Sequence, residues 1–483
     1  MTGTQLTLFN SLTRNQEPFA PSDGETARVY SCGPTVYNFA HLGNLRAYIF
    51  TDTLRRTLLF KGWDIRHVIN ITDVGHLTSD ADAGEDKMEL AAAGLGRDIW
   101  EVAAFYTAAF KANLRDLNIG DPTIWSVATD HIAEMIAFAE KIADTHCYQI
   151  ASGLYFDVTT VPDYGRLARS VSDANVVDGG ESRIDPVSGK RNPQDFAIWR
   201  KSPPGEQRQM EWDSPWGRGA PGWHLECSVM SLKYLGPEPF DIHTGGIDHR
   251  EIHHPNEIAQ NQAYCDCSAE QPGFTGARFW MHNNFLVDRT GKMSKSGGGF
   301  TTLQSLVDAG VAPLAYRLLC LTAHYRSELE FSGEAVAAAL TRLKRLVMAA
   351  EKLGTEQGVA APAYLDRLDT ALSDDLNTPQ ALVALDEMLA DKRLSPADRR
   401  ATLGHFDATL GLNLARLTRA ELRVRPVAAM LDEAAIEAKL DERKEARAAK
   451  DFARSDALRD ELIAAGIEVM DGDPLRWEWK VSL

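Results

Sequence analysis

The feature that most constrains the fold is a short apolar run that passes through a glycine-containing turn into a long helical pattern. Val29 and Tyr30 indicate a strand, and the next segment reads Cys32-Gly-Pro-Thr-Val-Tyr-Asn-Phe-Ala-His41-Leu-Gly-Asn44. Apolar residues then recur at every fourth position from Phe50 to Leu58, which is typical of a helix. We therefore expect a strand, a turn and a helix whose first backbone N–H groups can bind phosphate.

The composition indicates a globular protein. The 483 residues, of which 44% are hydrophobic, suffice for about three domains. No apolar run approaches the ~18 residues of a membrane span, and the first residues lack the layout of a secretory signal. We expect a cytoplasmic protein with no membrane partner.

The cysteines and the net charge narrow the function further. Six irregularly spaced cysteines in a chain of this size favour free thiols or metal ligands over a disulfide framework. A net charge of -17 argues against a general nucleic-acid binder, because such binding rests on neutralising phosphates. Any nucleic-acid partner must meet a local basic face.

The first half of the chain predicts a parallel sheet wound with helices. Residues 1–20 read as a lead-in, and strands and helices alternate from Ala27 to Leu117, with a second strand at Ile65–Ile71. We expect a helical stretch from Pro122 to Thr145 next. A strand over Gly153–Val158 and an irregular insertion to Trp216, rich in glycine, proline and charge, should follow.

The second half resumes the alternation and then turns helical. The patterns predict a helix from Cys227 to Leu235, a strand at Phe240–His243, a helix starting near Pro255 and an apolar run over Phe279–Val287. Beyond Thr302 nearly everything has helical period. The last helical segment covers Ala434–Ala465, and a strand-like tail contains Ile467, Val469, Trp477 and Trp479. The fold class is α/β: a doubly wound, Rossmann-type parallel-sheet domain with an insertion, followed by α-helical C-terminal domains and a small terminal segment.

A basic loop follows the apolar run. It reads Lys292-Met-Ser-Lys295-Ser296 and continues into glycines. Two lysines in such a loop can close over a triphosphate and stabilise charge that develops at the α-phosphate. The alternative is an ordinary solvated surface loop.

Four side chains form a candidate metal site. Cys32, Cys227, His253 and Glu257 are expected at strand ends or helix starts, on the side where a doubly wound sheet binds ligands. Two thiolates, an imidazole and a carboxylate suit tetrahedral zinc. Spacing alone leaves alternatives open: Cys227 could be a core thiol, His254 could replace His253, and Glu257 could favour its own helix N-terminus.

Two of these motifs together resemble the paired signature of class I aminoacyl-tRNA synthetases. The first motif is His41-Leu-Gly43-Asn44 and the second is the basic loop from Lys292 to Ser296. In that family the first motif usually ends in a second histidine. The Asn44 amide can still donate a hydrogen bond to phosphate, but it cannot become cationic.

A larger set of segments, in order along the chain, is similar to the cysteinyl-tRNA synthetase family. The segments are Tyr30–Tyr37, Asn70–Asp73, Asn192–Phe196, Pro221–Ser228, Phe240–Asp248, His253–Gln260, His324–Ser327, Asp374–Pro379 and Ala446–Phe452. Two positions depart from the family pattern: Pro255 replaces an acidic residue, and Val74-Gly-His76 replaces a more acidic run.

The resemblance implies a role for each matching residue. Cys32, Cys227, His253 and Glu257 would hold one Zn²⁺ per chain, and Thr72, Trp223 and His243 would surround the amino acid. The residues implied to bind ATP are Gly43, Gly245, Gly246, Asp248 and Lys295, and the residues implied in catalysis are His41, Asn44, Lys292 and Lys295.

The activity implied is ATP-dependent ligation of L-cysteine to tRNA(Cys) through a cysteinyl-adenylate, with Mg²⁺ bound to ATP, and we expect a monomer. An apolar pocket separates near-isosteres such as cysteine and serine by only ~1–3 kcal/mol. A zinc ion that takes the substrate as a thiolate would exploit the softness of sulfur, which a hydroxyl lacks. We expect the zinc to select the substrate and not to act as a hydrolytic metal.

The resemblance also divides the chain. Residues 1–125 and 216–290 would form the two halves of the catalytic domain around a connective insertion at 126–215. Residues 291–350 would carry the basic loop and a stem-contact region, 351–425 a helical bundle, and 426–483 the anticodon-binding region.

Charge in the anticodon-binding region allows two interpretations. Basic residues from Lys439 to Arg459 recur mostly at three- and four-residue steps and could form a stripe that meets tRNA, with Trp477 or Trp479 as stacking surfaces. The alternative is a solvated face balanced by the acidic residues between them.

Two rival functions remain to be separated. One is a cysteine-activating ligase that transfers cysteine to a small-molecule amine, which would not need an extended C-terminal region. The other is a non-catalytic tRNA- or zinc-binding relative, which would need neither the basic loop nor a complete donor set. Cys265-x-Cys267, His76, His131 and His324 are expected to be incidental or structural.

Overall fold

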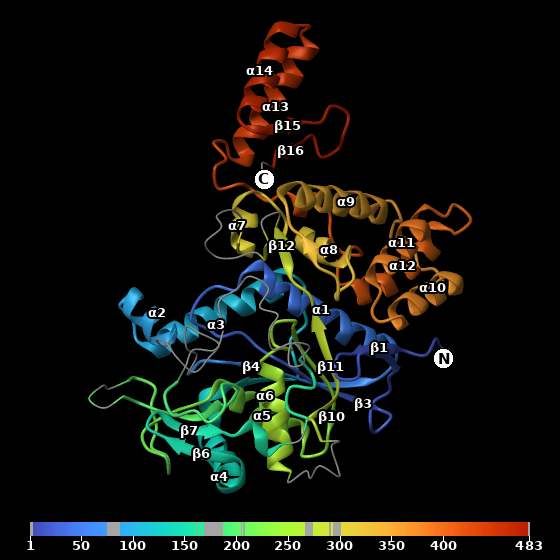
Figure 1. Cartoon of the computed structure of the whole chain (residues 1–483). Coiled ribbons are helices and arrows are strands. Elements are labelled where there is room, and N and C mark those ends of the chain that lie inside the picture. The colour runs from blue at the N-terminus through green and yellow to red at the C-terminus, as the bar shows by residue number, and fades with distance from the viewer. Residues whose placement is uncertain are drawn as a thin grey trace.

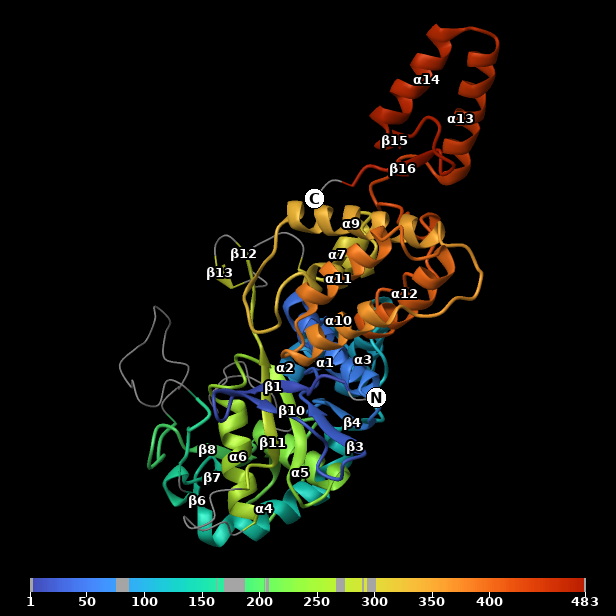
Figure 2. The ribbon, with the colours of Figure 1, turned by 90° about the vertical axis from the view of Figure 1, so that its right-hand side faces the viewer.

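The computed structural model describes residues 3–74, 87–161, 163–168, 187–203, 205, 208–265, 274–288, 291–292 and 301–481. Figures 1 and 2 show an elongated arrangement in which the sheet domain lies at one end, a group of helices lies in the middle and a helix pair projects at the other end.

A parallel sheet of five strands forms the core of the first domain. In spatial order the strands are β11 (Ala277–Asn283), β10 (Phe240–Gly246), β3 (Thr26–Ser31), β4 (Asp64–Ile71) and β5 (Ile124–Val127). The helices that connect or flank them are α1 (Leu42–Phe60), α2 (Lys87–Leu95), α3 (Ile99–Asp116), α5 (Trp223–Leu235) and α6 (His253–Tyr264). This confirms the doubly wound fold and the strand predicted at Ile65–Ile71.

The strand order reverses at the junction of the two sequence halves. β3 pairs with β4 on one side and with β10 on the other, in both cases in parallel. The chain leaves β3 toward α1 and leaves β10 toward α6, so the segments after these strands diverge at the same edge. Open parallel sheets bind ligands at such a point.

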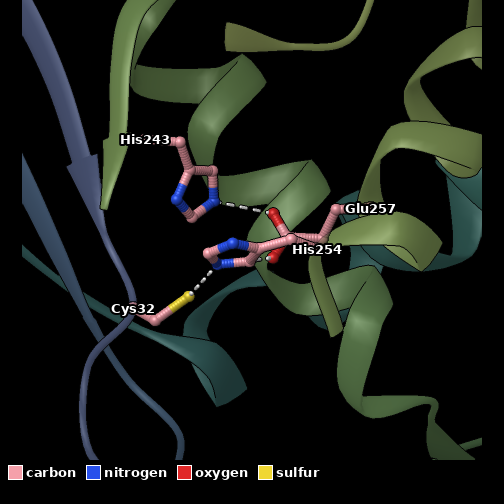
Figure 3. A group of neighbouring side chains, drawn as sticks. All are labelled: Cys32, His243, His254 and Glu257. Carbon is pink, nitrogen blue, oxygen red and sulfur yellow. Dashed lines mark hydrogen bonds and ion pairs between the residues drawn. The ribbon is translucent and has the colours of Figure 1, made fainter. Parts of the chain in front are cut away.

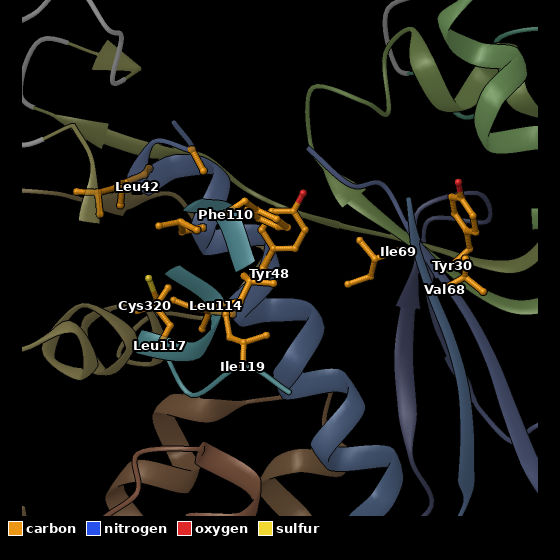
Figure 4. Packing of buried hydrophobic residues seen from close by; sticks show 14 of the residues in the cluster. Tyr30, Leu42, Tyr48, Val68, Ile69, Phe110, Leu114, Leu117, Ile119 and Cys320 are labelled. Atoms are coloured by element: carbon orange, nitrogen blue, oxygen red, sulfur yellow. The ribbon is translucent and has the colours of Figure 1, made fainter. Parts of the chain in front are cut away.

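Helix α1 is fixed by its start and by its buried face. The His41 ring accepts a hydrogen bond from the Asn44 backbone N–H, and the Asn44 side chain accepts one from the His41 N–H, which forms a capping box. Farther along, Tyr48 of α1 packs edge-to-face against Phe110 of α3, with ring centroids 4.8 Å apart (Figure 4). Apolar burial therefore holds α1 between the sheet and its neighbouring helices.

The first residues are not a lead-in, and that prediction was wrong. They form a hairpin of β1 (Thr7–Asn10) and β2 (Asn15–Pro18), and Leu6, Leu8 and Phe19 are buried against the sheet. The apolar residues are too few and too widely spaced to show a strand pattern, but each one fills the core.

Two predictions for residues 122–216 also need correction. The helical stretch from Pro122 to Thr145 begins with strand β5 and a 3-10 turn, η1 (Ala128–His131), before α4 (Ile132–His146). The insertion is more regular than expected, because it contains an antiparallel sheet. Its strands are β6 (Cys147–Ile150), β7 (Gly153–Phe156), β8 (Phe196–Lys201) and β9 (Gly219–Pro221), and a short turn, η2 (Val158–Thr160), follows β7.

A second small sheet and a group of helices follow. The sheet contains β12 (Leu286–Asp288), β13 (Gly291–Lys292) and β14 (Leu329–Glu330). The helices are α7 (Leu303–Asp308), α8 (Pro313–Leu321), α9 (Gly333–Glu351), α10 (Pro362–Ser373), α11 (Thr378–Ala390), α12 (Pro396–Leu410) and the turn η3 (Ala420–Leu422).

The C-terminal region has its own small core. The segment predicted as one helical stretch is a pair, α13 (Glu433–Ala448) and α14 (Phe452–Ala464), broken where Lys450 adopts a left-handed φ of 61°. The predicted tail strands are present as β15 (Ile467–Val469) and β16 (Trp477–Trp479). Both tryptophans are buried in this core, so the prediction that they offer stacking surfaces was wrong. Among the described helices, none combines the length and the apolar character needed to cross a membrane.

Candidate active site

A cavity of about 320 Å³ opens at the sheet edge where β3 and β10 diverge. Cys32 lies just after β3, and Gly245 and Gly246 end β10. The predicted site residues that line this cavity are Cys32, His41, Gly43, Asn44, Thr72, Trp223, Cys227, Gly245, Gly246, Asp248 and His253. His243 and Glu257 lie behind its wall, since neither is among the lining residues.

The structure brings the four predicted metal donors together. One donor atom each of Cys32, Cys227, His253 and Glu257 lies within 4.8 Å of the others. Cys32 follows β3, Cys227 lies on α5, and His253 and Glu257 lie one turn apart on α6. The last three are buried and Cys32 is half-buried.

A second set of donors overlaps the first. Cys32 and Glu257 also lie within 4.8 Å of donor atoms of His243 and His254. Figure 3 shows His254 Nε2 facing the Cys32 sulfur at 3.3 Å and His243 Nε2 facing Glu257 at 2.9 Å. The ambiguity between His253 and His254 that the sequence left open is therefore a real feature of the site.

Further side chains hold the imidazoles. The second ring nitrogen of His254 lies 2.8 Å from His282, which in turn lies 2.8 Å from the Ser11 hydroxyl. His253 Nδ1 lies 2.8 Å from a ring nitrogen of His224. Because the other nitrogen of each imidazole is engaged, the orientation of the donor nitrogens is set by these outer contacts.

The cluster shifts the pKa values of its own members. Burial alone would raise the pKa of Glu257, but His243 and His253 outweigh it and lower the pKa to about 2. Burial would lower the pKa of His253, yet Glu257 and Cys227 raise it to about 10. A hydrogen bond from Cys32, acting against burial, lowers the pKa of the Cys227 thiol to about 6.

One buried oxygen of the cluster makes an ion pair but, among the described residues, no hydrogen bond. His253 Nε2 lies 3.0 Å from Glu257 Oε1. Glu257 Oε1 has no hydrogen-bond partner within the described part of the chain. Buried carboxylate oxygens normally accept hydrogen bonds, so the donor chemistry and this incompletely satisfied oxygen both fit a cluster that could bind a metal ion.

The start of α1 faces the same cavity. His41, Gly43 and Asn44 line it. In the capping box, His41 Nδ1 and the side-chain oxygen of Asn44 each accept a hydrogen bond from a backbone N–H of the helix start. A Cβ on Gly43 would approach the His41 ring to 3.1 Å, so glycine at this position avoids crowding the ring. Asn44 is exposed. Its side-chain oxygen makes the capping hydrogen bond, whereas its amide nitrogen takes no part in the cap.

Gly245 and Gly246, the last two residues of β10, line the cavity where neighbouring side chains leave no room for a Cβ. A Cβ on Gly246 would lie 2.4 Å from the Asp248 carboxylate, and one on Gly245 would lie 2.7 Å from the His254 ring. Both distances are below van der Waals contact. These positions therefore need glycine because side chains from the following turn and from α6 approach their backbone.

The three residues predicted around the amino acid have different surroundings. Trp223 stacks on His253, with ring centroids 4.2 Å apart. The Thr72 hydroxyl donates to Glu226 Oε2 at 3.0 Å. His243 stacks on Trp280, with centroids 4.5 Å apart, so it lies beneath the donor cluster and not in the cavity.

Glu226 is a site residue that we did not single out from the sequence. It is fully buried, and its Oε1 has no hydrogen-bond partner among the described residues. Burial raises its pKa well above the usual range, and the Cys227 thiol adds to that effect. Its position inside the segment Pro221–Ser228 was the only signal that could have marked it.

Two segments that the sequence singled out hold one wall of the cavity. The buried Arg46 guanidinium donates to the backbone carbonyls of Asn284 and Phe285, and to that of Ser327 at 2.6 Å. On the far side, Arg326 donates to Asp375 at 2.7 Å. The segments His324–Ser327 and Asp374–Pro379 therefore connect the helical region to the wall that carries Asn284 and Phe285.

Some predicted residues cannot be placed. Lys295 lies outside the described residues, as do Ser296, His76 and Cys267. Lys292 is described only through its backbone, which pairs with Val287 in β12 and β13. Cys32, Cys147, Cys227 and Cys320 are free thiols.

The remaining histidines have structural contacts. His131 is buried and lies 3.0 Å from the Ser126 hydroxyl. His324 Nε2 lies 2.9 Å from the backbone carbonyl of Asp375.

Comparisons with protein families and curated proteins identify relatives of this chain. Residues 18–341 match the model for tRNA synthetases class I (C) catalytic domain, and residues 433–479 match the Cysteinyl-tRNA ligase anticodon binding domain. The cysteine–tRNA ligase of Novosphingobium aromaticivorans is 61% identical, over 99% of this chain and 97% of that protein. The cysteine–tRNA ligase of Zymomonas mobilis is 56% identical, over 98% of this chain and 97% of that protein.

Solved structures match at the level of the fold. A ternary LeuRS–tRNA–LeuAMS complex from Agrobacterium radiobacter aligns over 85% of this chain and 88% of that chain, with a TM-score of 0.57 and 12% identity. Mycobacterium tuberculosis methionyl-tRNA synthetase with methionyl-adenylate aligns over 80% and 90%, with a TM-score of 0.51 and 14% identity. Combined with the near full-length matches to curated relatives, these findings show that the chain belongs to the cysteine–tRNA ligase family of class I tRNA synthetases.

Proposed function

We propose that this chain joins L-cysteine to tRNA(Cys) at the expense of ATP, through a cysteinyl-adenylate. The cysteine carboxylate attacks the α-phosphate of ATP, which enters with Mg²⁺, and pyrophosphate leaves. A hydroxyl of the terminal adenosine of the tRNA then takes the cysteinyl group from the adenylate.

One observation carries the proposal. The two thiols of the donor cluster and the N-terminus of α1 line the same cavity. A helix N-terminus attracts phosphate and thiols attract a soft metal, so one cavity offers places for a nucleotide and for a sulfur-bearing substrate. A site for hydrolysis alone would have no use for both.

The donor set fits zinc, and we propose Cys32, Cys227, His253 and Glu257 as its ligands. A zinc ion held there would supply a soft Lewis acid that accepts a thiolate in preference to a hydroxyl. His243 and His224 orient Glu257 and His253 from behind. Trp223, which stacks on His253 at the cavity, would limit the space beside the substrate side chain.

The residues at the start of α1 would act on the nucleotide. The capping box holds His41 and Asn44 in place where the N-terminus of α1 lines the cavity. We propose that the Asn44 amide donates to a phosphate oxygen. Gly43, Gly245, Gly246 and Asp248 would hold the rest of the nucleotide, and Lys292 and Lys295 would stabilise the charge on the transferring phosphate.

The test is cysteine-dependent exchange of pyrophosphate into ATP, followed by transfer of labelled cysteine to tRNA. We expect exchange with cysteine, a far smaller rate with serine, and transfer to tRNA(Cys). Absence of exchange would refute the proposed adenylation. Exchange without transfer to tRNA would instead favour a ligase that uses a small amine, against which the match of residues 433–479 to an anticodon-binding domain already argues.

A further inference from the structure

A group of aromatic rings is exposed at the rim of the cavity. Phe39, in the turn before α1, is 45% exposed, and Phe105, on α3, is 44% exposed. Their ring centroids lie 5.8 Å apart, edge to face. Tyr106 packs beneath both rings, at 5.1 Å from each. Large apolar side chains exposed as a group usually mark a contact surface.

These rings lie between the cavity and a hollow beside α2. Phe39 and Tyr106 line the cavity, and Tyr106 also lines an adjoining hollow of about 540 Å³. The α2 side of that hollow is apolar, because Leu90, Ala91 and Leu95 face it. The hollow beside α2 and the cavity share Tyr37, Asn38, Lys87 and Tyr106 as lining residues, so the two adjoin at these rings.

Positive charge accompanies the rings, although the chain as a whole carries -17. The Arg97 guanidinium lies 5.6 Å from the centroid of Phe105, and the Lys87 ammonium lies 5.5 Å from the centroid of Tyr37. A partner that presents flat faces and negative charge in alternation would match this arrangement. A single-stranded nucleic acid has that chemistry.

We propose that this aromatic rim (Phe39, Phe105 and Tyr106, with Arg97 and Lys87) binds the unpaired 3′ end of the tRNA as that end enters the cavity. The inference rests on the proposed function, since transfer of the cysteinyl group brings that end to the adenylate. Unpaired bases stack on aromatic side chains, and Arg97 and Lys87 meet the phosphates between them. A second copy of the chain seated on the same rings would instead cover the mouth of the cavity.

Replacement of Phe105 tests the rim, because this ring lines neither the cavity nor the hollow. One stacked base contributes ~1–3 kcal/mol, so Phe105→Ala should raise the KM for tRNA about 5- to 150-fold. The KM for ATP and for cysteine in pyrophosphate exchange should stay unchanged. Phe105→Tyr should retain the wild-type KM for tRNA, while Phe105→Leu, which is apolar but has no ring face, should resemble Phe105→Ala.

Trp100→Ala is the matched control. Trp100 lies on the same helix and is 45% exposed, but it lines neither the cavity nor the hollow. Its replacement should leave the KM for tRNA unchanged. Equal losses in Trp100→Ala and Phe105→Ala, or full activity of Phe105→Leu, would overturn the proposal.

A shortened tRNA locates the contact. Wild type and Phe105→Ala should bind tRNA that lacks its unpaired 3′ nucleotides with equal affinity, because the stacking partner is gone. A difference that persists with the shortened tRNA would place the contact elsewhere and overturn the proposal. A dimer in sedimentation that Phe105→Ala dissociates would do the same. Lack of pyrophosphate exchange in the wild type would refute the proposed function instead.

Discussion

Glu257 of the donor cluster and the ion pair between Asp52 and Arg317 are both fully buried, yet they differ in how their polar atoms are satisfied. Arg317 donates to Asp52 at 2.6 Å and to the backbone carbonyls of Leu410 and Leu117 at 2.8 and 3.0 Å. Asp52 also accepts from Arg56 at 2.6 Å and from the Gly120 N–H at 3.1 Å. Every charged group of this pair has partners.

The donor cluster is different, because some of its buried polar atoms make no hydrogen bond. Glu257 Oε1 and His243 Nδ1, together with Oε1 of the neighbouring Glu226, lack hydrogen-bond partners among the residues that the structure describes, although Glu257 Oε1 forms an ion pair with His253. Buried polar groups are normally satisfied. A complete network holds elements together, as Arg317 of α8 does with α1 and the end of α12, whereas an incomplete one indicates a place for a ligand.

The largest expected effect follows from removing a donor. Cys227→Ser should abolish most bound metal, measured by elemental analysis. It should also reduce cysteine-dependent pyrophosphate exchange by more than the roughly 10–100-fold typical of changes outside the ligand shell. Cys147→Ser, at a free and half-buried thiol at the start of β6, is the control. Full metal content in Cys227→Ser would show that Cys227 is not a metal ligand.

Removing one member of the complete pair should instead affect stability. Arg317→Met leaves Asp52 buried without its main partner, which should cost about 3–5 kcal/mol and lower the Tm by differential scanning calorimetry. The exchange rate per folded molecule should hold. Arg342→Met, at a partly exposed pair with Asp386, should cost less than about 1 kcal/mol. Equal effects of the two substitutions would show that the buried network is not special.

The same pair gives a pH dependence. Burial would raise the pKa of Asp52, but Arg317 and Arg56 outweigh it and lower the pKa. Its contribution to stability is therefore present above the unfolded value of about 3.9 and is lost as the pH falls through the lower folded pKa. The difference in Tm between wild type and Arg317→Met should narrow below about pH 4. If the difference in Tm between the two proteins stays constant down to pH 2, ionised Asp52 is not the cause of the stabilisation by Arg317.

A substitution of Asn44 tests whether the start of α1 binds a ligand, as proposed for the donor cluster, or only stabilises the fold, as the Asp52–Arg317 pair does. Asn44→Asp keeps the oxygen that caps α1 but loses the amide N–H and adds negative charge. If that amide donates to phosphate, kcat/KM for ATP should fall about 10- to 100-fold, which corresponds to a charged hydrogen bond of about 1.5–3 kcal/mol. The Tm should barely change. A lower Tm with unchanged ATP kinetics would assign Asn44 a capping role alone.

The smallest effects are expected on the exposed charges of α13. Lys444 is exposed and makes no ion pair within the described part of the chain, whereas Lys439 lies 2.6 Å from Glu461. Lys444→Gln should weaken tRNA binding less than tenfold and reduce the salt dependence by about one phosphate contact. Lys439→Gln should weaken binding less, because its charge is already paired. The reverse order would favour a purely solvated face.

The sequence predicts most of the sheet because buried parallel strands leave a plain signal. The run Ile65–Ile71 carries four β-branched apolar residues in seven, and it appears as β4 with one residue more. The β1–β2 hairpin was not predicted because Thr7–Asn10 and Asn15–Pro18 are mostly polar. The few apolar residues in and beside these strands pack against parts of the fold that are distant in sequence. Local patterns cannot carry that information.

The site was predictable only in part for a related reason. The turn from Cys32 to Asn44 is continuous in sequence, so its capping box and its place at the sheet edge follow from local rules. The donor set is discontinuous, and spacing could not choose between His253 and His254. Both of these histidines lie beside Glu257 and Cys32, within reach of the same site. The Asp52–Arg317 pair left no sequence signal, because each residue simply occupies one position in a helix.

The order of the sheet strands has a consequence for how the protein is made. Cys32 follows β3, whereas the other three proposed donors lie on α5 and α6, and β10 must pair with β3 before the donors can meet. A ribosome releases the N-terminal half first, and that half carries one thiol of the site and an unpaired edge on β3. Metal uptake should therefore wait until α6 has emerged, and nascent chains that end before α5 should bind no zinc. Premature termination in this region would yield fragments that expose a strand edge, which makes them targets for chaperones rather than partly loaded enzymes.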